Sequence, residues 1–182
     1  GKNDKSFNEA VFVGITKFMN DTGIAVTELE PTNESMMEQS LKKLAQRGYS
    51  PIVAVGFTMA NAVQAAAEEY PDTKFTLIDM VVGLPNVQNV IYKEHEGSFL
   101  VGVLAAMNSS SGTVGFVGGM DIPLISRFEC GYKQGVKWQD SSMNILANMT
   151  GSTPAAWGNP SKGGELTRSQ VEAGADVVYA AA

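Results

Sequence analysis

A carboxylate, an aromatic ring and an amide lie close together at the start of the chain, at Asp4, Phe7 and Asn8. Ser6 and Glu9 have the spacing of a capping box, which predicts that a helix begins here. Phe7 and Asn8 then lie in its first turn, where free N–H groups and the positive end of the helix dipole can meet a ligand. The run indicates one wall of a polar-aromatic site; the alternative is a capped helix with Phe7 in the core.

Further candidate binding residues follow predicted strands or lie in a turn-rich loop. Phe57, Asp79 and Met120 each come after an apolar run that is typical of a buried strand. In an open parallel sheet, ligands bind outside the carboxyl ends of the strands. Trp157 lies in a loop rich in proline and glycine, and is interpreted either as a ring that stacks on a ligand or as a plug over a small core. Such aromatics suit a flat heterocycle, and nearby carboxylates and amides suit its hydroxyls and ring nitrogens.

Residues for catalysis or metal binding are too few to form a reaction centre. The only histidine, His95, begins a predicted helix, and no Gly-x-Ser-x-Gly motif accompanies it. The only cysteine, Cys130, lies in an apolar-aromatic stretch and is expected to be buried. This composition excludes a zinc site, and Asp4, Asp79 and Asp121 lie singly on separate elements. With no phosphate-binding loop or complete dinucleotide motif, we expect a binding protein without cofactor or metal, not an enzyme.

Composition excludes other classes. The 182 residues include 13 Lys plus Arg and 19 Asp plus Glu, a net charge of −6 with no basic stripe for a phosphate backbone. Nucleic-acid binding is therefore not expected. No apolar run reaches the length of a membrane span, and the first residues lack the pattern of a signal peptide.

Predicted helices and strands alternate along the chain. After the first helix, further helices are predicted at residues 34–47, 59–69, 94–107, 123–138 and 162–172. Strands are predicted at residues 23–29, 51–55, 74–78, 90–92, 113–117, 144–149 and 176–181. Strands separated by helices indicate parallel βαβ units, and hence an α/β fold. Since no strand precedes the first helix and the last strand ends the chain, we expect a fragment trimmed at both ends.

Several motifs occur in a set order, at residues 4–9, 56–57, 75–79, 92–102, 115–123, 128–135, 159–163 and 174–176. The strongest is Gly-Phe-Val-Gly-Gly-Met-Asp-Ile-Pro at 115–123. Together they resemble the basic membrane protein family of ABC-transporter substrate-binding lipoproteins, whose PnrA-like members bind purine nucleosides. The resemblance covers essentially all of the chain.

This resemblance implies the type I periplasmic-binding-protein fold, in which two Rossmann-like lobes with parallel sheets close on a ligand. Lobe one would span residues 1–92 without the family's first strand. Lobe two would span residues 93–182 without the family's C-terminal part. The chain by itself is therefore expected to bind ligand weakly or not at all.

The resemblance also implies how the ligand is held. Family members stack the base between one aromatic ring from each lobe. Phe7 matches the first ring, and Trp157 falls where the second, usually a phenylalanine, is expected. The expected ligand-binding residues are Asp4, Phe7, Asn8, Phe57, Asp79, Met120 and Trp157.

Partners and location follow from the same resemblance. The ligand would be a purine nucleoside such as adenosine, guanosine or inosine, and the protein partners an ABC permease and ATPase. The protein would be periplasmic or at the cell surface, held to the membrane only by a lipid anchor outside this sequence. The alternatives are another flat heterocycle such as riboflavin, for which Trp157 is the motivating residue, or a nucleoside-processing enzyme. A cytoplasmic regulator would need a DNA-binding module that this sequence lacks.

Overall fold

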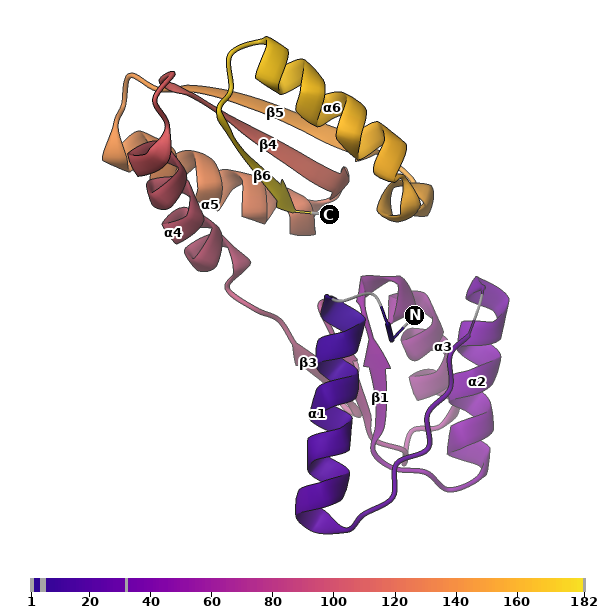
Figure 1. Ribbon diagram of the computed structural model, residues 1–182. Helices are drawn as coiled ribbons and strands as arrows, with labels where there is room; N and C mark the ends of the chain where they lie inside the picture. Colours follow the sequence, from indigo (N-terminus) through magenta and orange to yellow (C-terminus); the bar gives the residue numbers. More distant parts are fainter. Residues whose placement is uncertain (1, 4–5, 32, 182) are drawn as a thin grey trace. The chain divides into compact units, whose positions relative to one another are not determined.

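The chain builds two separate three-stranded sheets (Figure 1). The computed structural model describes residues 2–3, 6–31 and 33–181. Contacts divide the chain into Gly1–Tyr92 and Lys93–Ala182, here called unit one and unit two. In both sheets the paired strands are parallel, and helices connect consecutive strands except β2 and β3, which a loop joins; this confirms the predicted α/β class.

The strands of unit one end together at one edge of its sheet. The elements of this unit are α1 (Phe7–Thr22), α2 (Glu34–Gln46), β1 (Ile52–Val55), the 3-10 helix η1 (Phe57–Met59), α3 (Ala60–Glu69), β2 (Phe75–Ile78) and β3 (Val87–Val90). The sheet order is β1-β2-β3. Parallel pairing sets Val55 beside Ile78 and Ile78 beside Val90. The residues that follow β1 and β2 therefore share the carboxyl edge of this sheet.

The core of unit one lies between the sheet and helices α2 and α3. Phe75 and Leu77 are buried on β2 and alternate with half-buried residues, because successive side chains of a strand point to opposite faces. Helix α3 contributes Val63 and Ala66, both fully buried. The small alanines of α3 let the helix lie close to the sheet, so a unit with four-residue strands still forms a dry core.

A buried asparagine closes this core. The Nδ2 group of Asn86 donates to the carbonyl oxygens of Ala67, Tyr70 and Thr73, at 3.0, 3.2 and 3.1 Å. These carbonyls belong to the end of α3 and the turn after it, where helical partners run out. Asn86 thus supplies a donor to the Ala67 and Thr73 carbonyls and adds to the hydrogen bond that the Tyr70 carbonyl accepts from the Thr73 N–H group.

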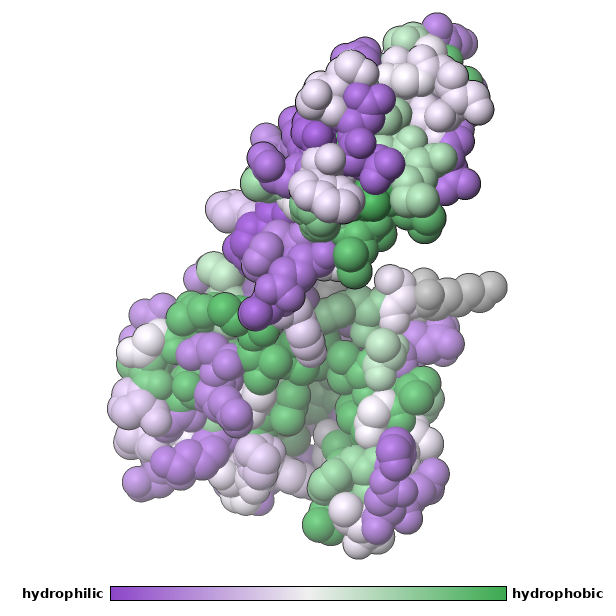
Figure 2. Space-filling view, turned by 90° about the vertical axis from the view of Figure 1, so that its left-hand side faces the viewer, coloured by the Kyte–Doolittle hydropathy of each residue, from purple (hydrophilic) through white to green (hydrophobic). Residues whose placement is uncertain are grey.

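Helix α1 packs much less tightly than α2 and α3. It begins at Phe7 after Ser6, as predicted, but the Ser6 side chain makes no capping hydrogen bond, so the capping box is wrong. None of its residues is buried, and Val13 and Phe18 are 59% and 45% exposed. Figure 2 shows hydrophobic residues at the surface over much of unit one.

The strand predicted at residues 23–29 is also wrong. Residues 24–30 are exposed throughout and form neither helix nor strand. Their β-branched pattern favours a strand locally, but a strand forms only with a hydrogen-bonded neighbour. Among the described residues, β1 pairs with β2 alone, so no partner strand lies alongside this segment.

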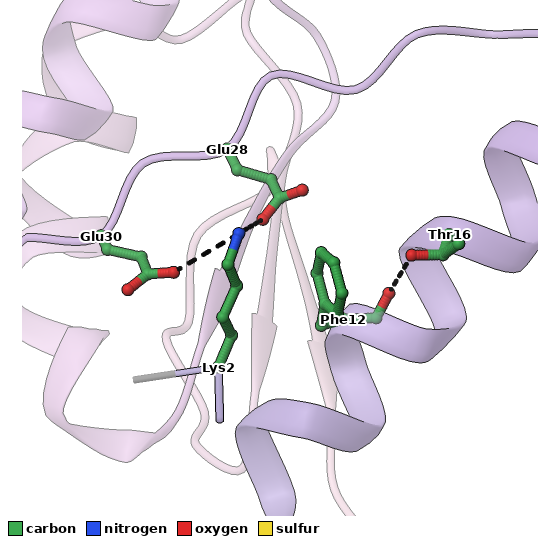
Figure 3. A network of polar contacts seen from close by, with 5 residues as sticks. All are labelled: Lys2, Phe12, Thr16, Glu28 and Glu30. Carbon is green, nitrogen blue, oxygen red and sulfur yellow. Dashed lines mark hydrogen bonds and ion pairs between the residues drawn. The ribbon is translucent and has the colours of Figure 1, made fainter. Parts of the chain in front are cut away.

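Polar contacts link this segment to the start of the chain (Figure 3). The Lys2 ammonium lies 3.3 Å from a Glu28 carboxylate oxygen and 3.8 Å from one of Glu30. It also lies 4.6 Å from the centre of the Phe12 ring on α1, within range of a cation–π contact. Exposed pairs of this kind add little stability, so they do not replace the hydrogen bonds of a sheet.

In unit two the first strand occupies the centre of the sheet. The elements are α4 (Glu94–Asn108), β4 (Thr113–Met120), α5 (Pro123–Gln139), β5 (Asn144–Gly151), the 3-10 helix η2 (Pro154–Gly158), α6 (Pro160–Glu172) and β6 (Val177–Ala181). The order is β5-β4-β6. Strand β4 is buried from Val114 to Gly119, as expected of a strand covered on both faces.

Helices α4 and α5 touch backbone to backbone because glycines line their contact. A Cβ atom at Gly102 would lie 2.1 Å from the carbonyl oxygen of Tyr132, and one at Gly135 would lie 2.0 Å from that of Phe99. No side chain fits in either place. These glycines, one on each helix, therefore determine how closely α4 and α5 approach.

Aromatic rings fill the space between these helices and the sheet. Phe116, Tyr132 and Tyr179 form a cluster with ring centres 5.3 to 5.9 Å apart. Burial raises the pKa of the Tyr132 hydroxyl to about 12, because the charged form would lose its hydration.

The remaining predicted elements of both units are confirmed with boundaries shifted by a few residues, except the strand predicted at 90–92, because β3 spans Val87–Val90 and shares only residue 90 with it. Cys130 is the exception in burial: it was expected inside, yet it is exposed. Its neighbours Gly131 and Tyr132 face the packed side of α5, which turns Cys130 outward. No helix in the described ranges is long and apolar enough to cross a membrane.

Candidate ligand-binding site

The carboxyl edge of unit one carries two residues with unusual backbone conformations. Gly56 has φ +94° and Asp79 has φ +69°. The Gly56 N–H donates to the carbonyl oxygen of Ile78 at 3.2 Å, and the Asp79 N–H donates to that of Val90 at 2.8 Å. Both strand ends are thus held in register although the chain turns sharply there. A left-handed aspartate at a strand end is a form of local strain that is common at functional sites.

The predicted aromatic of unit one lies at this same edge. Phe7 is half-buried in the first turn of α1, and its Cε1 atom would be 3.9 Å from a Cβ atom built on Gly56. The ring therefore lies beside the end of β1. Asn8 follows it on α1 and is half-buried. Asp4 lies outside the described residues.

Phe57 begins the 3-10 helix directly after Gly56 and is half-buried. Since β1 and β2 are neighbours, Phe57 and Asp79 both leave the sheet at the carboxyl edge. The structure thus brings Phe7, Phe57 and Asp79 to one edge of unit one, from segments far apart in the sequence.

The corresponding edge of unit two carries Met120 and Trp157. Met120 is half-buried at the end of β4 and pairs with Gly151 on β5. Trp157 lies in η2, directly after β5, and is 38% exposed. Its ring covers Gly119, where a Cβ atom would lie 2.4 Å from the ring atom Cζ3. Trp157 is therefore not a core residue: part of its side chain is exposed to solvent, and its ring rests on the end of the central strand.

An open pocket of about 500 Å³ lies next to Met120, at the start of α5. It is lined by Asp121, Ile122, Pro123, Ser126, Arg127 and Cys130. Arg127 forms an ion pair with Glu94, whose side chain is 5% exposed. Sequence reasoning did not select Ser126 or Arg127; the signal for them is the Ile-Pro pair that begins a helix at a strand end, where the first turn faces the sheet edge.

The strongest pKa shifts lie away from these edges and have structural causes. The Asp176 carboxylate accepts hydrogen bonds from the Ser109 hydroxyl and from the Ser111 and Ser110 backbone N–H groups, which lowers its pKa to about 2. Asp176 precedes β6 and donates its own N–H to Thr113, where β4 begins. It therefore clamps the opposite end of the sheet from Met120.

Within the described ranges, no three or more His, Cys, Asp or Glu residues are grouped so that they could hold an ion. The polar groups at the two edges are single carboxylates and amides beside aromatic rings. Such groups can hydrogen-bond and stack against a flat organic ligand.

The chain is similar in fold to a solved structure and in sequence to known relatives. The chain superimposes on a crystal structure of an ABC transporter system solute-binding protein from Aeropyrum pernix, with a TM-score of 0.82 and 27% identity, over 100% of this chain and 52% of that one. It is 29% identical over 184 residues to the ABC transporter nucleoside-binding protein BmpA of Lactococcus lactis. It is 30% identical over 185 residues to an uncharacterized lipoprotein of Pyrococcus abyssi. Each alignment includes 98% of this chain.

The two parallel α/β units are thus those of a solute-binding protein of the type I periplasmic-binding-protein fold. More narrowly, the chain belongs to the Bmp family, described as ABC transporter substrate-binding protein PnrA-like, whose family model matches residues 1–182. The chain spans about half the length of the relatives it matches, 51% of the Lactococcus protein and 46% of the Pyrococcus protein.

Proposed function

We propose that the protein containing this chain is the substrate-binding component of an ABC importer and that it binds purine nucleosides. Family membership supports the class of protein. One observation supports the proposed ligand: each unit has an aromatic ring beside a glycine at the carboxyl edge of its sheet. These are Phe7 at Gly56 and Trp157 at Gly119. Flat rings in such positions suit a base, whose faces are apolar and whose edges are polar.

Each candidate residue has a role in this proposal. Phe7 and Trp157 stack on the two faces of the base, and Phe57 and Met120 supply apolar contact. The Asn8 amide donates to or accepts from ribose hydroxyls and ring nitrogens, and the Asp79 and Asp4 carboxylates accept from ribose hydroxyls or ring N–H groups. The two units close on the ligand by a hinge motion, and the closed form is recognised by the permease and ATPase of the importer. No covalent step is involved, so the protein is a receptor and not an enzyme.

A second ligand class has one specific observation in its favour. An indole has a larger face than the phenylalanine ring usual at this position in the family, and Trp157 is exposed enough to offer it. A wider heterocycle such as riboflavin would use that area. In either case the protein would be lipid-anchored outside the cytoplasmic membrane, as the names of the Pyrococcus relatives suggest.

Calorimetry of the full-length mature protein tests the proposal. We expect inosine, guanosine or adenosine to release heat with one-to-one stoichiometry, and competition with riboflavin to separate the two ligand classes. Phe7→Ala and Trp157→Ala should each weaken binding by about 5- to 150-fold, the range for loss of one stacking contact. Trp138→Ala is the matched control, because Trp138 is a tryptophan 70% exposed on α5.

The absence of heat or thermal shift with every nucleoside and with riboflavin would contradict the proposal. Release of free ribose from inosine would indicate an enzyme instead. Equal effects of Trp157→Ala and Trp138→Ala would show that the ring in η2 is not part of the site.

A further inference from the structure

The contact between Trp157 and Gly119 is closer than any side chain would permit. A Cβ atom at Gly119 would lie 2.4, 2.7 and 3.0 Å from the ring atoms Cζ3, Cε3 and Cη2 of Trp157. A point in the plane of the ring beyond Cζ3 would lie farther from both Cε3 and Cη2, so these distances place it above the ring plane, close to Cζ3. One face of the indole is therefore covered by the backbone of β4.

A hydroxyl group holds the two partners together. Thr150, on the neighbouring strand β5, donates from its Oγ1 atom toward the carbonyl oxygens of Gly119 at 2.9 Å and Ala156 at 3.1 Å. Ala156 precedes Trp157 and is buried. Since one hydroxyl carries one proton, it is shared between the two carbonyls. Thr150 thus links the strand under the ring to the turn that carries the ring.

Backbone conformation does not explain why position 119 is a glycine. Gly56, Gly112 and Gly174 have positive φ values, which favour glycine. Gly119 lies in β4, and its φ is not positive. What excludes a side chain at 119 is the indole ring itself.

We propose that Gly119 is a positioning residue for ligand binding: it lets Trp157 lie flat on the strand end, so that only the opposite face of the indole meets the ligand. The Thr150 hydroxyl fixes that arrangement. This inference rests on the proposed function, because it assigns Trp157 as a stacking surface. It predicts that the depth at which a flat ring binds is set by residue 119, although residue 119 does not touch the ligand.

The test is Gly119→Ala in the full-length protein carrying Trp138→Phe, which leaves Trp157 as the tryptophan of this chain. We expect a red-shifted Trp157 emission and stronger acrylamide quenching without ligand, and inosine binding about tenfold weaker. Gly158→Ala is the matched control, since a Cβ atom there has nothing within 4 Å. Far-UV circular dichroism checks that both variants fold.

Two further variants separate positioning from general destabilisation. Trp157→Phe removes the ring atoms that a Cβ atom at 119 would strike, so Gly119→Ala should have little effect on inosine binding in that background. Thr150→Ser keeps the hydroxyl and should retain the emission of the parent, whereas Thr150→Val should shift it.

The outcomes distinguish this inference from the proposed function. If Gly119→Ala and Gly158→Ala have the same emission and quenching, the inference is overturned. It is also overturned if the emission shifts while inosine affinity is unchanged. If the emission shifts but the parent protein binds neither a nucleoside nor riboflavin, the proposed function fails, and with it the role of Gly119 in binding, while the packing of the ring stands.

Discussion

Units one and two are built from the same kinds of element, yet they differ in how completely those elements are packed. In unit two the central strand β4 is hydrogen-bonded on both sides and covers eight residues. In unit one every strand has four residues, including the central strand β2. Helix α5 buries five residues, whereas α1 buries none.

This difference shows that the carboxyl edge of a sheet, where the candidate site residues lie, can form without a well-packed core around it. Both units place an aromatic ring beside a glycine at the carboxyl edge of the sheet, at Gly56 and Gly119. The edge depends on parallel register, which four residues already provide. The stability of the surrounding unit depends on burial, which increases with the length of the strands and with the helices that cover them.

Adding a side chain at the closest contact between α4 and α5 should have the largest effect on stability. The effect should be confined to unit two. Gly135→Ala on α5 places a Cβ atom 2.0 Å from the Phe99 carbonyl oxygen. We expect a loss of about 3 kcal/mol in the free energy of unfolding, because the backbones of α4 and α5 must move apart. Urea titration followed by tryptophan emission measures it, since both tryptophans belong to unit two.

The control is Gly97→Ala on α4, where a Cβ atom meets nothing within 4 Å. It should leave stability unchanged or raise it by about 0.5 to 1 kcal/mol, because alanine favours a helix over glycine. Equal losses in both variants would mean that α4 and α5 do not pack through their glycines.

In unit one the largest loss is expected from a buried hydrogen-bonding group. Asn86→Ala leaves three carbonyl oxygens without the Nδ2 donor, which should cost about 2 kcal/mol. Hydrogen exchange of peptides from β2 should accelerate, while peptides from β4 keep their protection. Asn61→Ala, at an exposed position of α3, is the control and should change exchange little. Acceleration in both units would show that the two unfold together.

Acid should weaken unit two through a single carboxylate. The pKa of Asp176 in the folded chain, about 2, is below its ordinary value of 3.8. A group with a lowered pKa adds stability above pH 4, and that stability is lost as pH falls from about 4 to 2. Asp176→Asn should therefore remove this part of the pH dependence, as measured by tryptophan emission against urea at each pH. Ser109→Ala should reduce it.

Ser110→Ala is the matched control for the acid effect, because the hydrogen bond of Ser110 to Asp176 comes from its backbone N–H group. It should retain the pH dependence of the parent. If Asp176→Asn does so as well, the turn at 109–111 is not held by that carboxylate.

The smallest effect is expected on α1. Val13→Ser, at a position 59% exposed, should change the stability of this chain by less than about 0.5 kcal/mol. The same change at Val136 on α5, which is fully buried, should cost about 2 kcal/mol or more. Thermal unfolding of the two variants decides whether α1 and α5 differ as described; a loss at Val13 as large as that at Val136 would contradict the contrast.

Much of the fold was predictable because its signals are local. Helical periodicity located α2, α4 and α5, and glycine or proline marked where β1 and β4 begin or end. Residues 23–29 were mispredicted because β-branched residues favour a strand only when a neighbouring strand is present. Cys130 was mispredicted because the buried face of α5 is decided by its glycine contacts with α4, which composition does not reveal.

The candidate site divides in the same way. Ligands bind at the carboxyl ends of the strands in a parallel α/β fold. Phe57, Asp79 and Met120 could therefore be selected from their positions after apolar runs. The link between Trp157 and Gly119 could not, since the two residues are distant in the sequence and no periodic pattern relates them. Asp4 and Asn8 keep their predicted role, which awaits the binding experiments.

The order of most strands and helices, the parallel α/β class and the family follow from the sequence, because periodicity, turn residues and motifs are local features of the chain. The unequal packing of the two units, the outward turn of Cys130 and the indole lying on Gly119 were decided only by tertiary structure. The physical reason is that burial, close backbone approach and ring placement depend on distances between segments, and those distances are set when the sheets and helices pack.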